Sequence, residues 1–318
     1  GSHLQPEMAL SQDMVEGAAR RGADTALFVL GRTAGENDDV SPIAGDYGLS
    51  SVEEEQLALI CRYFSRVVLV VNSGNLIDLS VSERSQIGAV LLLGMPGMEG
   101  GRALSGILSG RVTPSGRLTD TVARSYADYP SSPAFGKQGG LIQPYTEDIF
   151  VGYRYFESFS HAKEKVLYPF GFGLSYTCFD MTCTEFSSAG GMIKVQIAVT
   201  NTGNAFSGKE TVMLYGEAPE GKMSRPALSL HAFAKTKVLS PGETEVLSLS
   251  FSAWDMAAFD DTGVSGHRDT WVLENGEYRI LFGNDIRALR LAGIYENRES
   301  LSRACAHLPT RLEALSLI

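Results

Sequence analysis

The middle of the chain reads EDIFVGYRYF at residues 147–156 and LYPFGFGLSYT at residues 167–177. Glycine and proline recur so often from roughly residue 128 to residue 176 that no regular helix or strand is predicted there. A long irregular stretch in a compact protein is usually functional or disordered, and the aromatic content here favours an ordered segment that wraps the preceding sheet domain. The stretch also separates two different patterns of hydrophobicity.

Before this stretch, short apolar runs of the kind found in strands buried on both faces alternate with helical patterns. The apolar runs occupy residues 26–30, 67–71 and 89–93. Helices are predicted over residues 14–21 and 51–64, the second with Ser50 or Ser51 as N-cap and three glutamates in its first turn. This layering predicts an α/β domain with a mainly parallel sheet.

After the stretch, apolar and polar residues alternate with a period of two, and turn residues separate the runs. Predicted strands occupy residues 194–199, 211–215, 244–251 and 277–282, with turns at Pro241-Gly242 and Asn275-Gly276. Alternation of this kind is typical of a small β-sandwich, and Tyr278 is a candidate aromatic residue of its core. The sandwich is expected to end near Gly293.

Composition limits the classes of function. The 318 residues are 44% hydrophobic and 20% charged, which suits a globular protein with two cores. A net charge of -10 and no clustered basic surface argue against nucleic acid as a partner. No apolar run approaches the roughly 18 residues of a membrane span. The four cysteines show no paired spacing, so we expect reduced thiols and a cytoplasmic protein.

Motifs for metal or cofactor binding are not found in the sequence. The five histidines are scattered, without a His-x-x-x-His pair or a neighbouring cysteine, so no metal and no cofactor are predicted. There is no Gly-x-Ser-x-Gly elbow for a serine hydrolase. The glycine-rich run at residues 94–100 follows a strand and opens a helix, but it matches no phosphate-binding motif and is interpreted as a tight turn.

The two motifs quoted first closely resemble the signature that closes the second domain of family 3 glycoside hydrolases. Two further runs resemble parts of the same domain, and three later runs resemble the fibronectin type III-like domain that follows it. These runs are PGMEGG (96–101), GRVTPSGRL (110–118), VTNTG (199–203), FAKT (233–236) and LSPGE (239–243). The resemblance covers nearly the whole chain. Together with the opening Gly1-Ser2-His3, which looks like the remnant of an expression tag, it predicts four parts. They are a tag remnant and lead-in (1–12), an α/β sandwich domain (13–177), the fibronectin type III-like β-sandwich (178–295) and a tail with a modest helical pattern (296–318).

In this family a (β/α) barrel supplies the nucleophilic aspartate, and a barrel of that type needs about 250 residues. No part of this sequence can form it. The resemblance therefore implies part of a retaining β-glucosidase or β-xylosidase with reversed domain order, in which the tail leads toward the barrel. Its substrates would be oligosaccharides or aryl β-glycosides, and the barrel would come from the same protein or a partner chain. The chain alone is expected to be inactive, and a homo-oligomer remains open.

Glu36 is the candidate catalytic residue. It lies in GRTAGENDD (31–39), directly after the first predicted strand and therefore at the carboxyl edge of the sheet, where open α/β sheets bind ligands. The resemblance implies that Glu36 is the general acid/base, and repulsion from Asp38 and Asp39 would raise its pKa. Relatives often carry Gly-x-Asp-Arg after this glutamate, whereas this chain has no basic residue there. The alternative interpretation is a solvated loop glutamate.

Asp46 and Tyr47 are candidate substrate-binding residues, with a turn that leads into the next helix as the alternative. Two other classes of function remain open beside the hydrolase. One is a carbohydrate-binding or assembly module that keeps the fold without turnover. The other is a flavodoxin-like nucleotide binder, which the missing phosphate loop disfavours.

Overall fold

The computed structural model describes residues 9–32, 40–135 and 144–305. Their contacts divide the chain into two compact units that are interleaved along the sequence. The first unit contains the residues up to Val112, together with Val122–Glu147 and Lys165–Tyr168. The second contains Thr113–Thr121, Asp148–Glu164 and the residues from Pro169 onward. The chain therefore crosses between the units five times, after residues 112, 121, 147, 164 and 168. The domain boundary at residue 177 stays a prediction.

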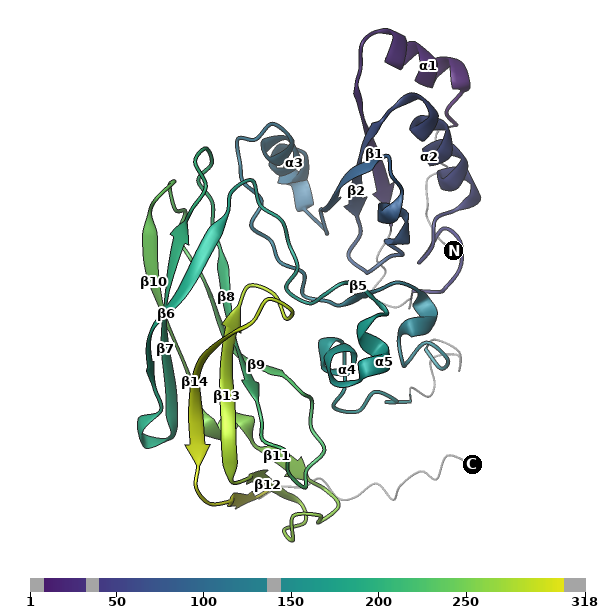
Figure 1. The fold of residues 1–318 in the computed structure, drawn as a ribbon. Coiled ribbons are helices and arrows are strands. Elements are labelled where there is room, and N and C mark those ends of the chain that lie inside the picture. The colour runs from purple at the N-terminus through teal and green to yellow at the C-terminus, as the bar shows by residue number, and fades with distance from the viewer. Residues whose placement is uncertain (1–8, 33–39, 136–143, 306–318) are drawn as a thin grey trace. The chain divides into compact units, whose positions relative to one another are not determined.

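The first unit is built on the predicted parallel sheet. Its strands are β1 (Thr25–Gly31), β2 (Arg66–Asn72) and β3 (Ile87–Leu92), hydrogen-bonded in the order β1-β2-β3. The helices are α1 (Gln12–Arg20), α2 (Ser51–Tyr63) and α3 (Gly100–Leu108). Figure 1 shows α1 and α2 on one side of the sheet and α3 on the other. The predicted α/β class is thus confirmed, with element ends within two residues of those expected.

Burial of the three strands differs from the prediction. Only the central strand β2 is buried on both faces, through Val67, Leu69, Val70 and Val71. Leu27 and Val29 on β1 and Leu92 on β3 are exposed, because each of these strands lies at an edge of the described sheet. An apolar run alone does not distinguish an edge strand from a central one.

The glycine- and proline-rich stretch contains short regular elements, which corrects the prediction that it has none. These are α4 (Tyr153–Ser158), α5 (Ser160–Lys163) and β5 (Val166–Tyr168), the last paired with β4 (Val122–Ala123). The stretch also does not wrap the sheet domain alone, since residues 148–164 and those after 168 belong to the second unit.

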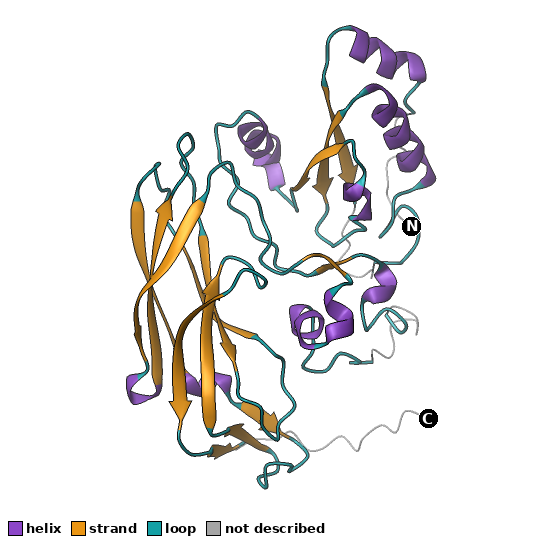
Figure 2. Cartoon of the chain, in the orientation of Figure 1, coloured by secondary structure: helices purple, strands orange, loops and turns teal. Residues whose placement is uncertain are grey.

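The second unit is a β-sandwich, as predicted. One sheet has the order β10-β7-β6 and the other the order β14-β13-β8-β9, and the two sheets face each other (Figure 2). The first sheet consists of β6 (Phe179–Ser187), β7 (Met192–Asn201) and β10 (Thr244–Ser252). The second consists of β8 (Thr211–Glu217), β9 (Ser229–Lys235), β13 (Gly276–Gly283) and β14 (Arg290–Asn297).

Apolar side chains from both sheets form the main core, in which Tyr278 is fully buried, as predicted. Strand β8 is buried on its other face as well, where Met213 and Tyr215 form a second cluster. Tyr153 of α4 packs there against Phe170, with ring centroids 4.8 Å apart. Tyr153 and Phe170 of the central motifs therefore serve core packing.

The C-terminal part of the described chain contains more strand structure than expected. Strand β14 continues to Asn297, beyond the predicted end near Gly293. A third, small sheet has the order β11-β12-β15 and consists of β11 (Ala258–Asp260), β12 (Thr270–Leu273) and β15 (Leu301–Ala304). The helical pattern predicted near residues 308–317 lies outside the described residues.

Neither a membrane-spanning helix nor a disulfide bond is found among the described residues. None of their helices combines the length and the apolar character needed to cross a membrane. The four cysteines, Cys61, Cys178, Cys183 and Cys305, are all free thiols.

Candidate functional site

The candidate site lies at the carboxyl end of β1. The strand ends at Gly31, and the N–H of Arg32 still donates to the carbonyl oxygen of Asn72 at 3.0 Å. Glu36 follows within residues 33–39, which lie outside the described residues. What the structure defines is the chain on both sides of this segment.

Arg32 is the anchor on the N-terminal side. Its Nε donates to the carbonyl oxygen of Asp46 at 2.8 Å, and its Nη2 donates to that of Gly48 at 3.1 Å. Both Nη atoms also donate to the carboxylate of Glu53, at 2.6 and 2.8 Å. The two side chains are only 7% and 4% exposed. The segment that holds Glu36 therefore starts from a residue fixed in a buried, bidentate ion pair.

The position of Glu53 follows from the start of α2. Ser50 is the N-cap, and its hydroxyl accepts the N–H of Glu53 at 3.1 Å. In return, Glu53 Oε2 accepts the N–H of Ser50 at 2.8 Å, which completes a capping box. A buried charge pair is stable only when its remaining hydrogen-bonding groups are satisfied. The cap and the guanidinium together satisfy this carboxylate.

A tight turn forms the C-terminal side. The Asp46 carboxylate accepts the N–H of Ser41 at 2.6 Å, and the N–H of Gly45 donates to the carbonyl oxygen of Gly48 at 3.0 Å. Gly45 has a φ of 88°, a conformation that a side chain would strain. Because Arg32 binds two carbonyl oxygens of this turn, one side chain holds together the two ends of the segment that contains Glu36.

Asp46 and Tyr47 have structural partners in the described chain. The Tyr47 ring is buried and meets Tyr126 edge-on, with centroids 5.4 Å apart. Burial, with smaller contributions from Tyr129 and Asp78, raises the pKa of the Tyr47 phenol, so the hydroxyl stays protonated. These contacts fit the turn that leads into α2. Contact of either residue with substrate stays a prediction.

The sequence interpretation missed the roles of Arg32 and Glu53. Both residue types were visible, an arginine directly after a buried strand and a glutamate three positions after a serine N-cap. The sequence indicated Glu53 only as one of three glutamates in the first turn of the helix, and nothing in it pairs Glu53 with a residue 21 positions earlier.

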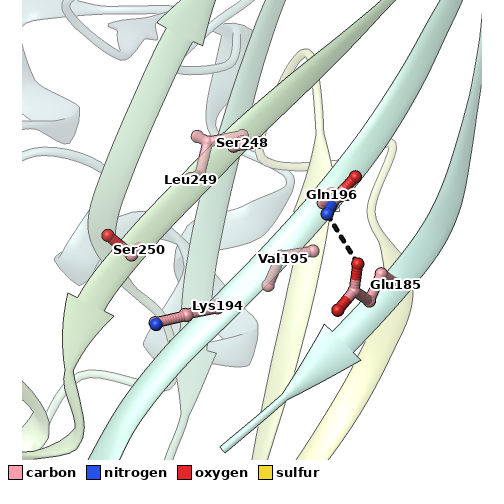
Figure 3. A pocket seen from close by; sticks show the side chains of 7 residues that line it. All are labelled: Glu185, Lys194, Val195, Gln196, Ser248, Leu249 and Ser250. Carbon is pink, nitrogen blue, oxygen red and sulfur yellow. Dashed lines mark hydrogen bonds between the residues drawn. The ribbon is translucent and has the colours of Figure 1, made fainter.

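A shallow hollow of about 200 Å³ on the β-sandwich does not compete with this site. It lies on the face of the β10-β7-β6 sheet that carries Lys194, Gln196, Ser248 and Ser250 (Figure 3). These residues alternate along their strands with core residues, so their side chains point to the solvent. Its one carboxylate, Glu185, accepts a hydrogen bond from Gln196, and no second acid stands opposite it among the lining residues.

Comparison with known proteins places the chain in a family. The model for the glycosyl hydrolase family 3 C-terminal domain matches residues 9–176, more than half of the chain. The chain belongs to glycoside hydrolase family 3. A second model, for a fibronectin type III-like domain, matches residues 210–286. Both parts of the resemblance found in the sequence are thereby confirmed.

Curated family 3 relatives agree with this assignment. A β-glucosidase of Ruminococcus albus is 41% identical over 286 residues, which are 90% of this chain and 30% of the relative. The β-glucosidase A of Butyrivibrio fibrisolvens is 38% identical over 323 residues, 90% of this chain and 38% of that protein. The chain thus spans about a third of the length of these relatives.

Solved structures show the same pattern. A β-glucosidase from Paenibacillus barengoltzii superposes with a TM-score of 0.89 at 42% identity, over 94% of this chain and 33% of that one. The β-glucosidase 3B of Thermotoga neapolitana, solved in complex with α-D-glucose, superposes with a TM-score of 0.84 at 34% identity, over 95% and 42%. Both domains of this family 3 chain therefore have counterparts in single relatives.

Proposed function

We propose that this chain is part of a retaining β-glycosidase, a β-glucosidase or β-xylosidase, in which Glu36 is the general acid/base. The nucleophilic aspartate lies in a barrel domain supplied by the same gene product or by a partner chain. The single observation that carries the proposal is that Arg32, at the carboxyl edge of β1, binds the turn at Asp46 and Gly48 and so fixes the described chain on both sides of residues 33–39. Membership in family 3 supports it.

The chemistry divides between two carboxyl groups. In a retaining glycosidase one carboxylate attacks the anomeric carbon, and the other protonates the leaving oxygen and then activates water, with the two groups about 5–5.5 Å apart. Glu36 has the second role. Such a short separation requires the acid/base residue to be held in place, and a segment fixed at its base by a buried ion pair meets that requirement better than a free loop. The proposal extends to Asp46 and Tyr47 as sugar contacts beside Glu36.

The test uses the gene product that contains both this chain and the barrel, with aryl β-glucoside and aryl β-xyloside as substrates. Removing the acid/base spares glycosylation by an activated leaving group but stalls hydrolysis of the covalent intermediate, and azide can replace water in that step. Glu36→Ala is expected to lose turnover, and azide is expected to restore it. Glu55→Ala, which removes an exposed glutamate of α2, should keep wild-type turnover.

Two results would contradict the proposal. Unchanged turnover in Glu36→Ala would leave this chain a structural or carbohydrate-binding module. Hydrolysis by the 318-residue chain alone would place a nucleophile within this sequence, because no covalent glycosyl intermediate can form without one.

A further inference from the structure

A pocket of about 380 Å³ lies within the second unit, on the β-sandwich. It is lined by residues of β8, β9, β12 and β13, by the segment from Asp255 to Phe259, and by Ile149 and Arg154 from the region of α4. All of these residues belong to the second unit. The volume falls within the roughly 300–1,000 Å³ of small-ligand sites. No role is assigned to this pocket by the family 3 reaction proposed above.

An aromatic pair, of which Trp271 is exposed, forms one wall. Trp271 of β12 and Phe259 of β11 are cross-strand partners, with ring centroids 5.3 Å apart at 60°. Trp271 is 44% exposed although it is one of the largest apolar side chains in the chain. The face of an indole ring is electron-rich and attracts the weakly positive C–H groups of a ligand that covers it. The wall is therefore suited to a ligand with an apolar, C–H-bearing face.

Polar groups with spare hydrogen-bonding capacity form the other walls. One oxygen of the Asp255 carboxylate accepts the N–H of Ser252 at 3.0 Å, and the other has no partner among the described residues. Arg154 forms no ion pair with any described residue. The ring nitrogens of His231 likewise have no hydrogen-bond partner in the described chain, while its ring stacks on Phe251 at 4.8 Å.

Gly216 has no side chain, and the ring of His231 and the sulfur of Met256 occupy the space that one would fill. A Cβ at this position of β8 would lie 2.9 Å from Nε2 of His231 and 3.0 Å from the sulfur of Met256. Glycine weakens a strand interior and often marks a close approach. Here its missing side chain allows the imidazole to lie against the strand at the pocket wall.

The balance of charge points to a neutral ligand. The second arginine of the pocket, Arg225, is already paired with Glu274 at 2.6 Å. What remains is one carboxylate, Asp255, and one guanidinium, Arg154. An anion would meet the carboxylate and a cation would meet the guanidinium, whereas hydroxyl groups can donate to the one and accept from the other.

We propose that this pocket binds a neutral saccharide, which stacks on Trp271 and hydrogen-bonds through its hydroxyl groups to Asp255, Arg154 and His231. A sugar ring combines an apolar C–H face with hydroxyl groups around its edge, which are the two features that the walls present. The pocket belongs to the second unit and Glu36 to the first, so this site would add a second point of attachment for carbohydrate.

The test is calorimetric titration of the 318-residue chain with cellobiose. Wild type is expected to bind, and Trp271→Ala and Asp255→Asn are each expected to weaken binding about tenfold or more. Phe233→Ala is the matched control, because it removes a 71% exposed aromatic ring of β9 outside the pocket. Glu36→Gln should bind as wild type does, which separates this site from the proposed catalytic residue.

Fluorescence gives an independent readout, because the chain has only two tryptophans. Cellobiose should change the emission of Trp254→Phe, in which Trp271 is the only tryptophan left, and should not change that of Trp271→Phe. Thermal melts of each variant establish that it is folded. Any of three results overturns the proposal: no binding by wild type, binding that Trp271→Ala and Asp255→Asn leave unaltered, or tighter binding of galacturonate than of cellobiose.

Discussion

Arg32 combines two tasks in one side chain. Its guanidinium neutralises Glu53 in a setting with little solvent and ties β1 to the turn that precedes α2. The planar fork of arginine can make these contacts at once, which the single ammonium group of lysine cannot. If Glu36 is the acid/base, as we propose, Arg32 acts as a positioning residue for its segment.

Replacing Arg32 should be costly because it leaves the Glu53 carboxylate buried without its cation. Breaking a buried pair from one side typically costs about 3–5 kcal/mol. We expect Arg32→Ala to lower the free energy of unfolding by that order, measured by urea denaturation. Arg84→Ala is the control. Arg84 forms an ion pair with Glu54, the residue that follows Glu53 on α2, and the two side chains are 35% and 45% exposed. Exposed pairs contribute up to about 1 kcal/mol. Equal losses in both variants would contradict the anchoring role.

His231 makes stability depend on pH. Burial lowers the pKa of its imidazole to about 4, with Asp255 opposing the shift and Arg154 adding to it. Between pH 6.5 and 4 the unfolded chain therefore binds a proton that the folded chain does not, and the free energy of unfolding falls as the pH is lowered. The loss from this residue approaches about 3 kcal/mol near pH 4.

The prediction is checked with urea denaturation at several pH values. His231→Gln should reduce the slope of the free energy of unfolding between pH 6.5 and 4, whereas His267→Gln, at an exposed histidine, should leave it unaltered. If both variants keep the wild-type slope, the imidazole is not desolvated in the folded protein.

At the scale of single residues, the sequence pointed to one candidate, Glu36, and missed the contacts of Arg32 beside it. Glu36 stood out because it lies just after an apolar strand, in a run that resembles the family. It falls outside the described residues. Arg32 was not recognised, because its partners lie 14 to 21 residues away and meet it only after folding. Hydrogen bonds between distant segments leave no periodic signal in a sequence.

At the scale of elements, long and regular patterns predicted structure well. The 51–64 helix matched α2 because a capping box fixed its start. The strands predicted after the central stretch matched β7, β8, β10 and β13, because each of them packs a face on a common core. Short elements such as α4 and α5 were missed, since a helix of one or two turns depends on tertiary packing rather than on its own pattern. The exposed edge strands had the same apolar character as the central one.

Strand β8 illustrates a limit of pattern reading. Its sequence TVMLYGE is nearly continuous in apolar residues, although it belongs to an antiparallel sandwich. The structure explains the run, because Val212 and Leu214 face the main core while Met213 and Tyr215 face Tyr153 and Phe170. A strand covered on both faces within a sandwich indicates that another segment lies over the sheet.

At the scale of the whole molecule, the second unit depends on segments that come earlier in the chain. Glu210, at the start of β8, is 3% exposed and accepts hydrogen bonds from Arg117 and from Nδ2 of Asn284, the latter at 3.1 Å. Arg117 belongs to the crossing segment Thr113–Thr121. The buried Glu210 carboxylate of the β-sandwich is therefore neutralised by Arg117, which precedes the sandwich in the sequence.

This dependence predicts how fragments behave. A fragment of residues 178–318 keeps Asn284 but leaves the Glu210 carboxylate without its cation, so it should unfold at lower urea concentration than a fragment of residues 113–318. Glu210→Gln should stabilise the shorter fragment and destabilise the longer one. Equal unfolding midpoints for the two unmodified fragments would show that the upstream segments are dispensable.

The five crossings between the units also bear on how such proteins are inherited. Domain shuffling needs a recombination junction that leaves each partner whole, and a junction at the end of the LYPFGFGLSYT motif would separate the sandwich from Arg117 and from the residues that cover Met213 and Tyr215. A junction anywhere between residues 113 and 168 would divide both units at once. We therefore expect a gene fusion or circular permutation to preserve both units only when it keeps residues 113–168 together with both of them.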